Sequence, residues 1–267
     1  MKVDNKVLLV TGAGSGIGRE LVLHLLSKGA SVAGVDLNAK ALEETSRLAD
    51  AHRTQFAAFV TNITERPAVE ALPAQVLERF GSIDGIINNA GIIQPFVKVS
   101  NLDFSVIERV LNVNLYGTLF VIKSFLPHLM QRPRAHIVNI SSMGGFVPVP
   151  GQTIYGASKA AVKLLSEGLG SELIDTTVRV TVVFPGAVAT NILANVSIGA
   201  LDTISSKGNM AAMQPSKAAR IIVNGIERDA FHVFVGRDSI LMDKLYRLNP
   251  AFAARIIAKK MSTLLTR

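Results

Sequence analysis

The chain has 267 residues, of which 49% are hydrophobic and 18% are charged, a composition typical of a folded domain with a full core. Its net charge is +8, but seven Lys/Arg against two Asp lie from Arg237 to the end, so that +5 of the excess belongs to this last segment. No basic stripe with interleaved aromatic residues occurs elsewhere, and we therefore expect no nucleic-acid partner.

The chain contains no cysteine, which excludes disulfides and thiolate metal sites and fits a reducing compartment. We expect no metal, and any redox chemistry must come from a bound cofactor. No apolar run approaches the roughly 20 residues of a membrane-spanning helix, and the first residues lack the pattern of a signal peptide. These features favour a cytoplasmic protein.

Short apolar, β-branched runs alternate along the chain with longer stretches of helical period. The runs are continuous rather than alternating, as in strands that are buried on both faces of a sheet. They predict strands at 6–11, 31–36, 56–60, 85–89, 135–140, 179–184 and 231–236. Segments such as 19–30 and 68–81 carry apolar residues three and four apart and end near glycine. The pattern predicts an α/β fold: one Rossmann-like, doubly wound parallel sheet with helices on both faces.

The first predicted strand runs into TGAGSGIG, residues 11–18. Gly12, Gly16 and Gly18 allow a tight turn and close approach of a ligand, and the amides of the following helix can receive a pyrophosphate. Ser15 and Ile17 belong to the same turn. The spacing departs from the general G-x-G-x-x-G fingerprint, and tight packing alone is the competing interpretation.

Asp36 ends the second predicted strand, where an acidic residue would meet the hydroxyls of an adenosine ribose. A carboxylate there repels a 2′-phosphate, and the neighbours Leu37 and Asn38 offer no compensating cation. This favours NAD over NADP. Taken alone, Asp36 could equally be a helix N-cap or a turn residue.

The stretch YGASK begins a predicted helix, with Tyr155 and Lys159 four residues apart on one face. A nearby ammonium favours the ionised form of a phenol, whose pKa is ordinarily about 10, and so suits the tyrosine to general acid/base work. An isolated pair of this spacing could also be a simple surface pair.

Several motifs in one order resolve this ambiguity, because together they resemble the short-chain dehydrogenase/reductase family of oxidoreductases. They are TGAGSGIG, NNAG at 88–91, the asparagine of LNVNLYG, the serine of NISS, YGASK, and PG at 185–186. The resemblance covers residues 1–236, which we expect to form the dehydrogenase domain with a substrate loop at 187–213.

The resemblance implies a catalytic set of four residues. Tyr155 would exchange a proton with the substrate oxygen, and Lys159 would lower the pKa of Tyr155 and bind the nicotinamide ribose. Ser142, thirteen residues before Tyr155, would hold the substrate oxygen, whereas Ser141 would be structural. Asn114, in a helix interior where its propensity is poor, would hold a water linked to Lys159.

The resemblance also implies the walls of a cofactor cleft. The segment Asn88, Asn89, Ala90 and Gly91 would line the adenine side and brace the sheet, and Pro185, Gly186, Val188 and Thr190 would receive the nicotinamide carboxamide. The chain departs from the family in one place: Asn62, followed by Ile63, stands where an aspartate commonly contacts the adenine amino group. An amide oxygen can still accept that hydrogen bond.

The implied reaction is reversible hydride transfer between NAD(H) and a secondary alcohol or ketone. The expected pocket segments 92–96, 144–151 and 187–213, the last with Ile192, Leu193, Met210 and Met213, carry few charges and favour a lipophilic substrate. These side chains could instead pack only against one another. His128 and His136 lie outside the motifs and are not expected to be catalytic. An NADPH-dependent carbonyl reductase of the same family is the alternative.

Residues 237–267 read as a basic, amphipathic helical extension, with Ala253, Ile257, Met261, Leu264 and Leu265 on its apolar side. One interpretation is peripheral contact with an anionic membrane, which would make the protein a cofactor-binding protein acting at that surface. The other is a helix docked over the substrate cleft or against a neighbouring subunit. The resemblance also implies a homodimer or homotetramer, in which Val162, Leu165 and Leu169 could serve the interface or only the sheet.

Overall fold

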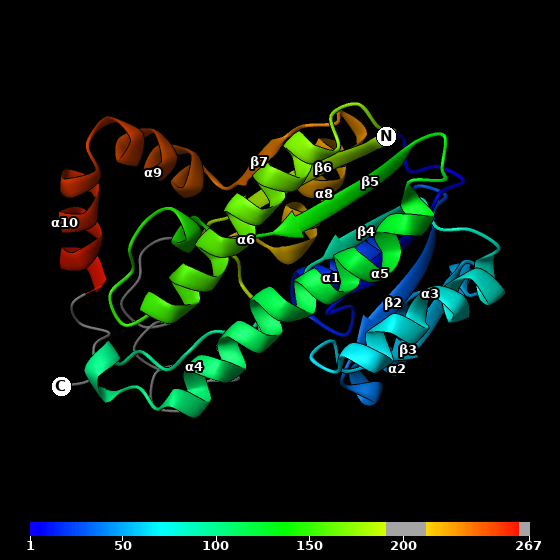
Figure 1. Cartoon of the computed structure of the whole chain (residues 1–267), viewed down its shortest axis with the longest axis horizontal. Coiled ribbons are helices and arrows are strands. Elements are labelled where there is room, and N and C mark those ends of the chain that lie inside the picture. The colour runs from blue at the N-terminus through cyan, green and yellow to red at the C-terminus, as the bar shows by residue number, and fades with distance from the viewer. Residues whose placement is uncertain (191–211, 262–267) are drawn as a thin grey trace.

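The computed structural model describes residues 1–190 and 212–261, and the side chains up to residue 259 (Figure 1). The described residues form one seven-stranded sheet in the order β3-β2-β1-β4-β5-β6-β7, with every pair parallel. The strands are β1 (Val7–Thr11), β2 (Ser31–Asp36), β3 (Phe56–Val60), β4 (Gly85–Asn88), β5 (Ala135–Ile140), β6 (Val178–Pro185) and β7 (His232–Val235). The predicted doubly wound fold is confirmed.

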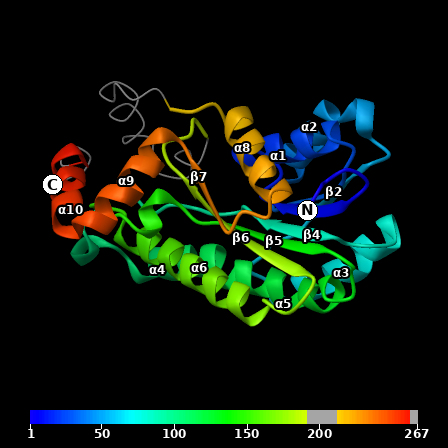
Figure 2. The ribbon, with the colours of Figure 1, turned by 90° about the horizontal axis from the view of Figure 1, so that it is seen from above.

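Helices cover both faces of this sheet, as the view along its edge shows (Figure 2). One layer holds α1 (Gly16–Ser27), α2 (Ala39–Leu48) and α8 (Pro215–Glu227), and the other holds α3 (Arg66–Phe80), α4 (Phe104–Leu111), α5 (Thr118–Leu129) and α6 (Thr153–Glu172). Short helical turns occur at η1 (Asp50–His52), η2 (Val99–Asn101) and η4 (Met143–Gly145). The two last helices are α9 (Arg237–Leu248) and α10 (Pro250–Met261).

The sheet positions the site because its strand order reverses between β1 and β4. From β1 the chain first builds outward through β2 and β3, and then returns to add β4 on the other side of β1. Loops after β1 and β4 therefore diverge to opposite faces and leave a crevice at the carboxyl ends of the strands, where ligands bind in folds of this kind. Each of the two apolar cores lies on one face of the sheet, against α1 and α8 or against α3, α5 and α6.

One helix meets the length and composition of a membrane span, contrary to the expectation from the sequence. The continuous helical stretch Phe104–Leu129 has a mean hydropathy of 1.2 in its most apolar window. It consists of α4, a π-helical segment η3 (Asn112–Gly117) and α5. Val121, Phe125 and Leu129 are fully buried in the core on one face of the sheet, as in the core helix of a globular domain.

The C-terminal helices pack against the rest of the chain. Ala253 and Ile257, on the side of α10 that was a candidate for membrane contact, are buried, and Ile257 joins Val147 and Met242 in a small apolar cluster. The apolar side of α10 therefore packs within the chain over its described part. Leu264 and Leu265 lie outside the described residues.

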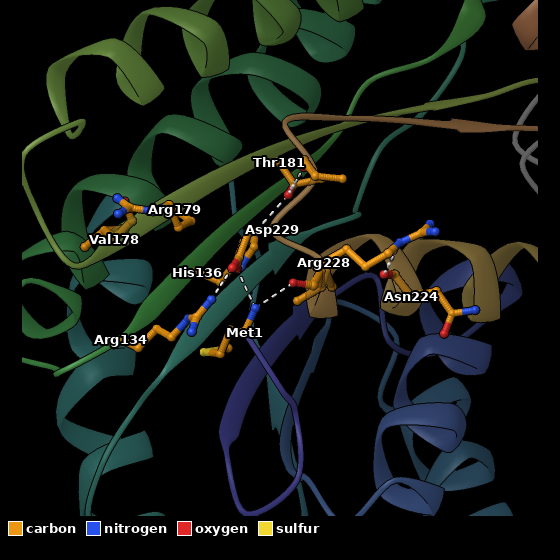
Figure 3. A network of polar contacts seen from close by, with 11 residues as sticks. Met1, Arg134, His136, Val178, Arg179, Thr181, Asn224, Arg228 and Asp229 are labelled. Atoms are coloured by element: carbon orange, nitrogen blue, oxygen red, sulfur yellow. Dashed lines mark hydrogen bonds and ion pairs between the residues drawn. The ribbon is translucent and has the colours of Figure 1, made fainter.

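A buried polar network lies near the amino ends of β5 and β6, away from the crevice (Figure 3). His136 Nε2 lies 2.8 Å from Thr181 Oγ1, and the Thr181 hydroxyl donates to the Ala230 carbonyl. Because that hydroxyl proton is already used, His136 Nε2 carries the ring proton. Asp229 lies near the other ring nitrogen, Nδ1, of His136, and it forms ion pairs with the Met1 amino group and with Arg134. His136 thus belongs to a network of structural contacts and does not line the cleft.

Candidate active site

A cleft of about 990 Å³ opens at the carboxyl ends of the strands. Its walls come from the loops after β1, β2, β3, β4, β5 and β6, from the first turns of α1 and α6, and from residues of α2, of α4 and of the helical segment 112–117. The residues predicted from the sequence that line it are Gly12, Ser15, Gly16, Ile17, Asp36, Asn62, Ile63, Asn89, Ala90, Gly91, Ser142, Tyr155, Lys159, Pro185, Gly186, Val188 and Thr190. Gly18 and Asn114 lie behind these walls, buried in the protein.

The glycine turn between β1 and α1 can be built only without side chains at certain positions. Gly12 and Gly16 have φ angles of 68° and 53°, in the left-handed region. A Cβ on Gly18 would lie 1.9 Å from the Gly12 carbonyl oxygen. Asn89 braces the turn, since its Nδ2 donates to the Thr11 carbonyl at 3.0 Å. The turn thus holds the start of α1 close to the strand.

This turn fits a dinucleotide. Ser15 is the N-cap residue of α1, and in the part of the chain described here its side chain makes no cap hydrogen bond. The start of α1 lines the cleft at Ser15, Gly16 and Ile17, and the first amides and the dipole of a helix favour an anion at such a place. The absence of a side chain at Gly16 keeps the cleft open between the turn and Thr190, because a Cβ on Gly16 would lie 3.3 Å from the Thr190 side chain.

Asp36 lies at the end of β2 and turns its carboxylate toward the glycine turn. Oδ2 accepts the Gly14 amide at 2.9 Å, and Oδ1 accepts the Asn38 amide at 2.9 Å. The N-cap of α2 is Asn38, whose Oδ1 accepts the Ala41 amide, so Asp36 is not a helix cap. Of the two alternatives for Asp36, the helix cap is therefore wrong, whereas the bond from the Asn38 amide two residues on is that of a turn residue.

Two arginines in the cleft wall escaped the sequence reasoning. Arg19 reaches the glycine turn from α1, where its Nη2 donates to the Gly14 carbonyl and pairs with Glu44 at 2.7 Å. Arg109 of α4 lines the cleft one helical turn before Val113. The sequence neighbours of Asp36 offer no cation, but α1 brings Arg19 close to it through the fold.

Asn62 is less available to adenine than expected. Its Oδ1 already accepts both the amide and the hydroxyl of Thr64, at 3.1 and 2.8 Å, and its Nδ2 donates to Glu65. A carbonyl oxygen has two lone pairs, so these local bonds use its accepting capacity. Asn62 thus shapes the turn after β3.

The three polar groups of the proposed reaction centre come from two elements. The hydroxyl of Ser142, in the turn after β5, accepts the Gly144 amide at 3.0 Å and forms a hydrogen bond with Tyr155. Lys159, one turn after Tyr155 on α6, donates from Nζ to the Ile140 carbonyl at 2.9 Å. The hydroxyl of Ser141 points away and donates to the Lys159 carbonyl at 2.8 Å. Of the two serines, Ser142 is the one against the phenol.

Burial dominates the electrostatics of this centre. It raises the pKa of Tyr155, and the hydrogen bond with Ser142 opposes that rise. Burial also lowers the pKa of Lys159 to about 8. The sequence predicted that Lys159 would lower the pKa of Tyr155, but in this structure the phenol has a raised pKa. The cause is the desolvation of the buried phenol, which disfavours its charged form.

Asn114 lies in the π-helical segment η3 and clamps the loop after β4. Its Oδ1 accepts the Ile92 amide at 2.8 Å, and its Nδ2 donates to the Ile92 carbonyl and the Ser158 hydroxyl. A Cβ on Gly91 would lie 3.1 Å from Lys159 Nζ and 3.2 Å from Asn114 Oδ1. Asn114 thus ties helix α6 to the cleft wall beside Lys159. Insertions of this π-helical kind are frequent at functional sites.

Gln94 supports the start of α6 and was not singled out in the sequence. Its Oε1 accepts the amides of Ile154 and Tyr155 at 2.8 and 3.0 Å, and Gln152 Nε2 donates to its carbonyl. Gln94 is fully buried. The only signal in the sequence is one polar residue inside the apolar run IIQPF.

The loop after β6 is tied to the last helices. Ala187 donates its amide to Asp238 Oδ2 at 2.8 Å, and a Cβ on Gly186 would collide with the same carboxylate. Val188 pairs with Met213 across the part of the substrate loop that is not described. Ile192, Leu193 and Met210 lie outside the described residues.

The segment 144–151 contributes less to the cleft than expected. Phe146 packs edge-on against Phe184 and Phe234, and Val147 is buried against α9 and α10. Met213 packs partly buried against the core around α1 and α8. Phe146, Val147 and Met213 therefore pack against other side chains of the protein and, in the described part of the chain, do not line the cleft.

Comparison with known proteins agrees with this geometry. The family model of the short chain dehydrogenase matches residues 6–200. The chain is 36% identical over 262 residues to "Putative oxidoreductase SadH" of Mycobacterium tuberculosis, covering 96% of this chain and 95% of that protein. A short chain dehydrogenase/reductase from Burkholderia phymatum, solved in complex with NAD, superposes with a TM-score of 0.86 at 25% identity, over 94% of this chain and 96% of that one. A further structure, of ElxO with NADP bound, has the same fold, with a TM-score of 0.77 at 24% identity over 86% of this chain and 97% of that one. The chain therefore belongs to the short-chain dehydrogenase family of oxidoreductases.

Proposed function

We propose that this chain is an NAD-dependent dehydrogenase that interconverts a secondary alcohol and a ketone, with Tyr155 as general acid/base. The observation that carries the proposal is the convergence of Ser142, Tyr155 and Lys159 in the wall of the cleft that the glycine turn opens. The turn fits a dinucleotide and the three polar groups fit an alcohol oxygen. The two requirements of the reaction therefore meet in one cavity.

Each polar side chain has a distinct task. When bound, the nicotinamide supplies or accepts the hydride. Tyr155 takes the proton of the substrate hydroxyl during oxidation and returns it to the ketone oxygen during reduction. Ser142 donates to the same oxygen and so stabilises negative charge as it develops there. Lys159 keeps a positive charge near the phenol and favours its ionised form.

The raised pKa of Tyr155 makes Lys159 essential to this scheme. Burial opposes ionisation of the phenol, so a neighbouring cation must offset that cost for proton transfer near neutrality. The pKa of Lys159 is about 8, which leaves its ammonium protonated at pH 7. We expect turnover to depend on both groups and to respond steeply to loss of either.

The preference for NAD rests on Asp36. Its carboxylate faces the glycine turn and would repel a 2′-phosphate on the adenosine ribose. The solved structures of similar fold include one with NAD and one with NADP, so the preference follows from the residues of this chain and not from the fold.

A lipophilic substrate is supported by the apolar part of the cleft wall. Ile92, Val113, Ile140 and Val188 line it with apolar side chains. Such walls favour apolar ligands, and the polar groups of the centre then fix one oxygen. We propose secondary alcohols with an extended hydrocarbon chain. A screen of homologous alcohols with NAD tests this, and a substrate whose kcat/KM is insensitive to chain length would contradict it.

The decisive experiment compares Tyr155→Phe with Tyr116→Phe, which makes the same chemical change at an exposed tyrosine outside the cleft. General acid/base catalysis contributes about 10²–10⁴-fold, so Tyr155→Phe should lose at least about 100-fold in kcat while its NADH affinity stays within about twofold. Tyr116→Phe should keep its turnover. Retention of turnover by Tyr155→Phe within about tenfold would exclude the proposed role.

Self-association is a further part of the proposal. The candidate positions Val162 and Leu169 are buried within the chain, and Leu165 and Leu169 pack against the core on one face of the sheet. The outer face of the same helix layer instead exposes Phe104, Tyr116 and Leu164, by 80%, 49% and 69%. Large exposed apolar side chains on neighbouring helices support a homo-oligomer formed through this face.

A further inference from the structure

Arg19 places a cation in the part of the cleft where the adenosine ribose would lie. Its Nη2 donates to the carbonyl of Gly14, whose amide donates to Asp36 Oδ2. The guanidinium and the carboxylate are therefore joined through one residue of the glycine turn, and both line the cleft. A phosphate on the ribose beside Asp36 would find its counter-charge here, because arginine suits phosphate oxygens through two parallel hydrogen bonds.

Glu44 of α2 forms an ion pair with Arg19. Its Oε2 lies 2.7 Å from Arg19 Nη2, and the Nε of Arg19 donates to Thr45 Oγ1 at 3.1 Å. The side chain of Arg19 is 19% exposed and that of Glu44 is 51% exposed. The acid therefore lies at the rim of the cleft, where it can be changed without opening the core, and it pairs with the cation that Gly14 links to Asp36.

We propose that Glu44 is a specificity residue: by pairing with Arg19 it withholds the guanidinium from a 2′-phosphate and works with Asp36 to favour NAD over NADP. This inference rests on the proposed function. With Glu44 in place, two carboxylates oppose one cation at this end of the cleft. Without the charge of Glu44, Arg19 and Asp36 balance, and a phosphate no longer meets a net negative wall.

The test is Glu44→Gln, with Glu43→Gln as its matched control. Glu43 is the preceding residue, is exposed, and makes no ion pair with Arg19 in the described part of the chain. The two variants change the net charge equally and on the same helix. Titrations with NADH and NADPH, followed by nicotinamide fluorescence, give both dissociation constants without any substrate, and the chain has no tryptophan to interfere.

We expect Glu44→Gln to lower the ratio of the NADPH to the NADH dissociation constant by about tenfold, mainly through tighter NADPH binding. Glu43→Gln should change the ratio by less than about twofold, because solvent and salt screen a charge that does not touch the site. Adding Arg19→Met to Glu44→Gln should restore the wild-type ratio. An equal effect of the two glutamine variants, or a double variant that keeps the whole gain, would overturn the inference.

The outcomes separate this inference from the proposed function. Wild-type protein that binds NADH, together with a Glu44→Gln ratio that does not move, overturns the role of Glu44 and leaves the dehydrogenase proposal standing. Wild-type protein that binds neither dinucleotide overturns both. If Arg19→Met disturbs the glycine turn, NADH affinity falls as well, and the comparison of the two glutamate variants still decides.

Discussion

Replacing Gln94 by methionine should weaken the start of the catalytic helix while leaving the side-chain volume almost unchanged. The first amides of a helix have no partner within the helix, and here Gln94 Oε1 accepts those of Ile154 and Tyr155. Methionine offers no comparable acceptor. Leaving a buried donor unpaired costs about 1–3 kcal/mol, so two of them cost about 2–6 kcal/mol; methionine also removes Gln94 Nε2, itself buried without a partner among the described residues, and the net loss of unfolding free energy should be about 2–4 kcal/mol.

Equilibrium unfolding in urea measures this change, with Gln131→Met as the control. Gln131 is exposed after α5, and the same substitution there should stay within about 0.5 kcal/mol. We also expect Gln94→Met to lower kcat more than NADH affinity, because Tyr155 itself begins to lose its fixed position. If Gln94→Met unfolds at the same urea concentration as Gln131→Met, the two hydrogen bonds do not stabilise the helix and the reasoning fails.

Three further predictions follow from the described contacts. Gly18→Ala should abolish NADH binding because its Cβ would lie 1.9 Å from the Gly12 carbonyl oxygen, whereas Gly168→Ala, with nothing within 4 Å of its Cβ, should bind normally and gain about 0.5–1 kcal/mol of stability. Burial lowers the pKa of His136 from 6.5 to about 3, so its contribution to stability is full above pH 6.5 and is lost as the pH falls toward 3. His136→Gln should therefore flatten the decline of the urea midpoint between pH 7 and 4, and parallel declines in the two proteins would contradict this. Leu164→Glu should reduce the oligomer mass measured by light scattering, and an unchanged mass would show that α6 does not form the interface.

The central strands were predictable because they are buried on both faces, and the edge strand β3 because its sequence is apolar throughout, although Ala58 and Val60 are exposed. The runs at 31–36, 56–60 and 135–140 match β2, β3 and β5 to the residue. Continuous apolar sequence is what a central parallel strand requires, and no competing pattern obscures it. The glycine turn and the Tyr155 helix were equally readable, since each depends on residues close together in the sequence.

Contacts between distant segments account for what the sequence left out. Arg19 meets Glu44 only because α1 and α2 pack on the same face of the sheet, and Gln94 meets Tyr155 across 61 positions. The direction of the pKa shift of Tyr155 also depends on burial, which no local pattern gives. Asn62 was misjudged for a local reason: Thr64, two residues on, donates the hydrogen bonds to Oδ1 that a ligand was expected to donate.

The π-helical segment η3 has a consequence for the alignment of the helix that contains it. Val110 and Leu129 are both buried on the inner side of this helix, and five regular turns take about 18 residues, one fewer than separates them. The wider turn at Asn112–Gly117 absorbs the surplus residue, so that the apolar stripe of α5 remains in line with that of α4. Deleting one residue there would make the helix more regular but would rotate the apolar side of α5 away from that of α4. Phe125 would then be turned by about 100° relative to Val110. The π-helical turn thus allows one continuous helix to pack α5 against the sheet and to place Asn114 beside the cleft.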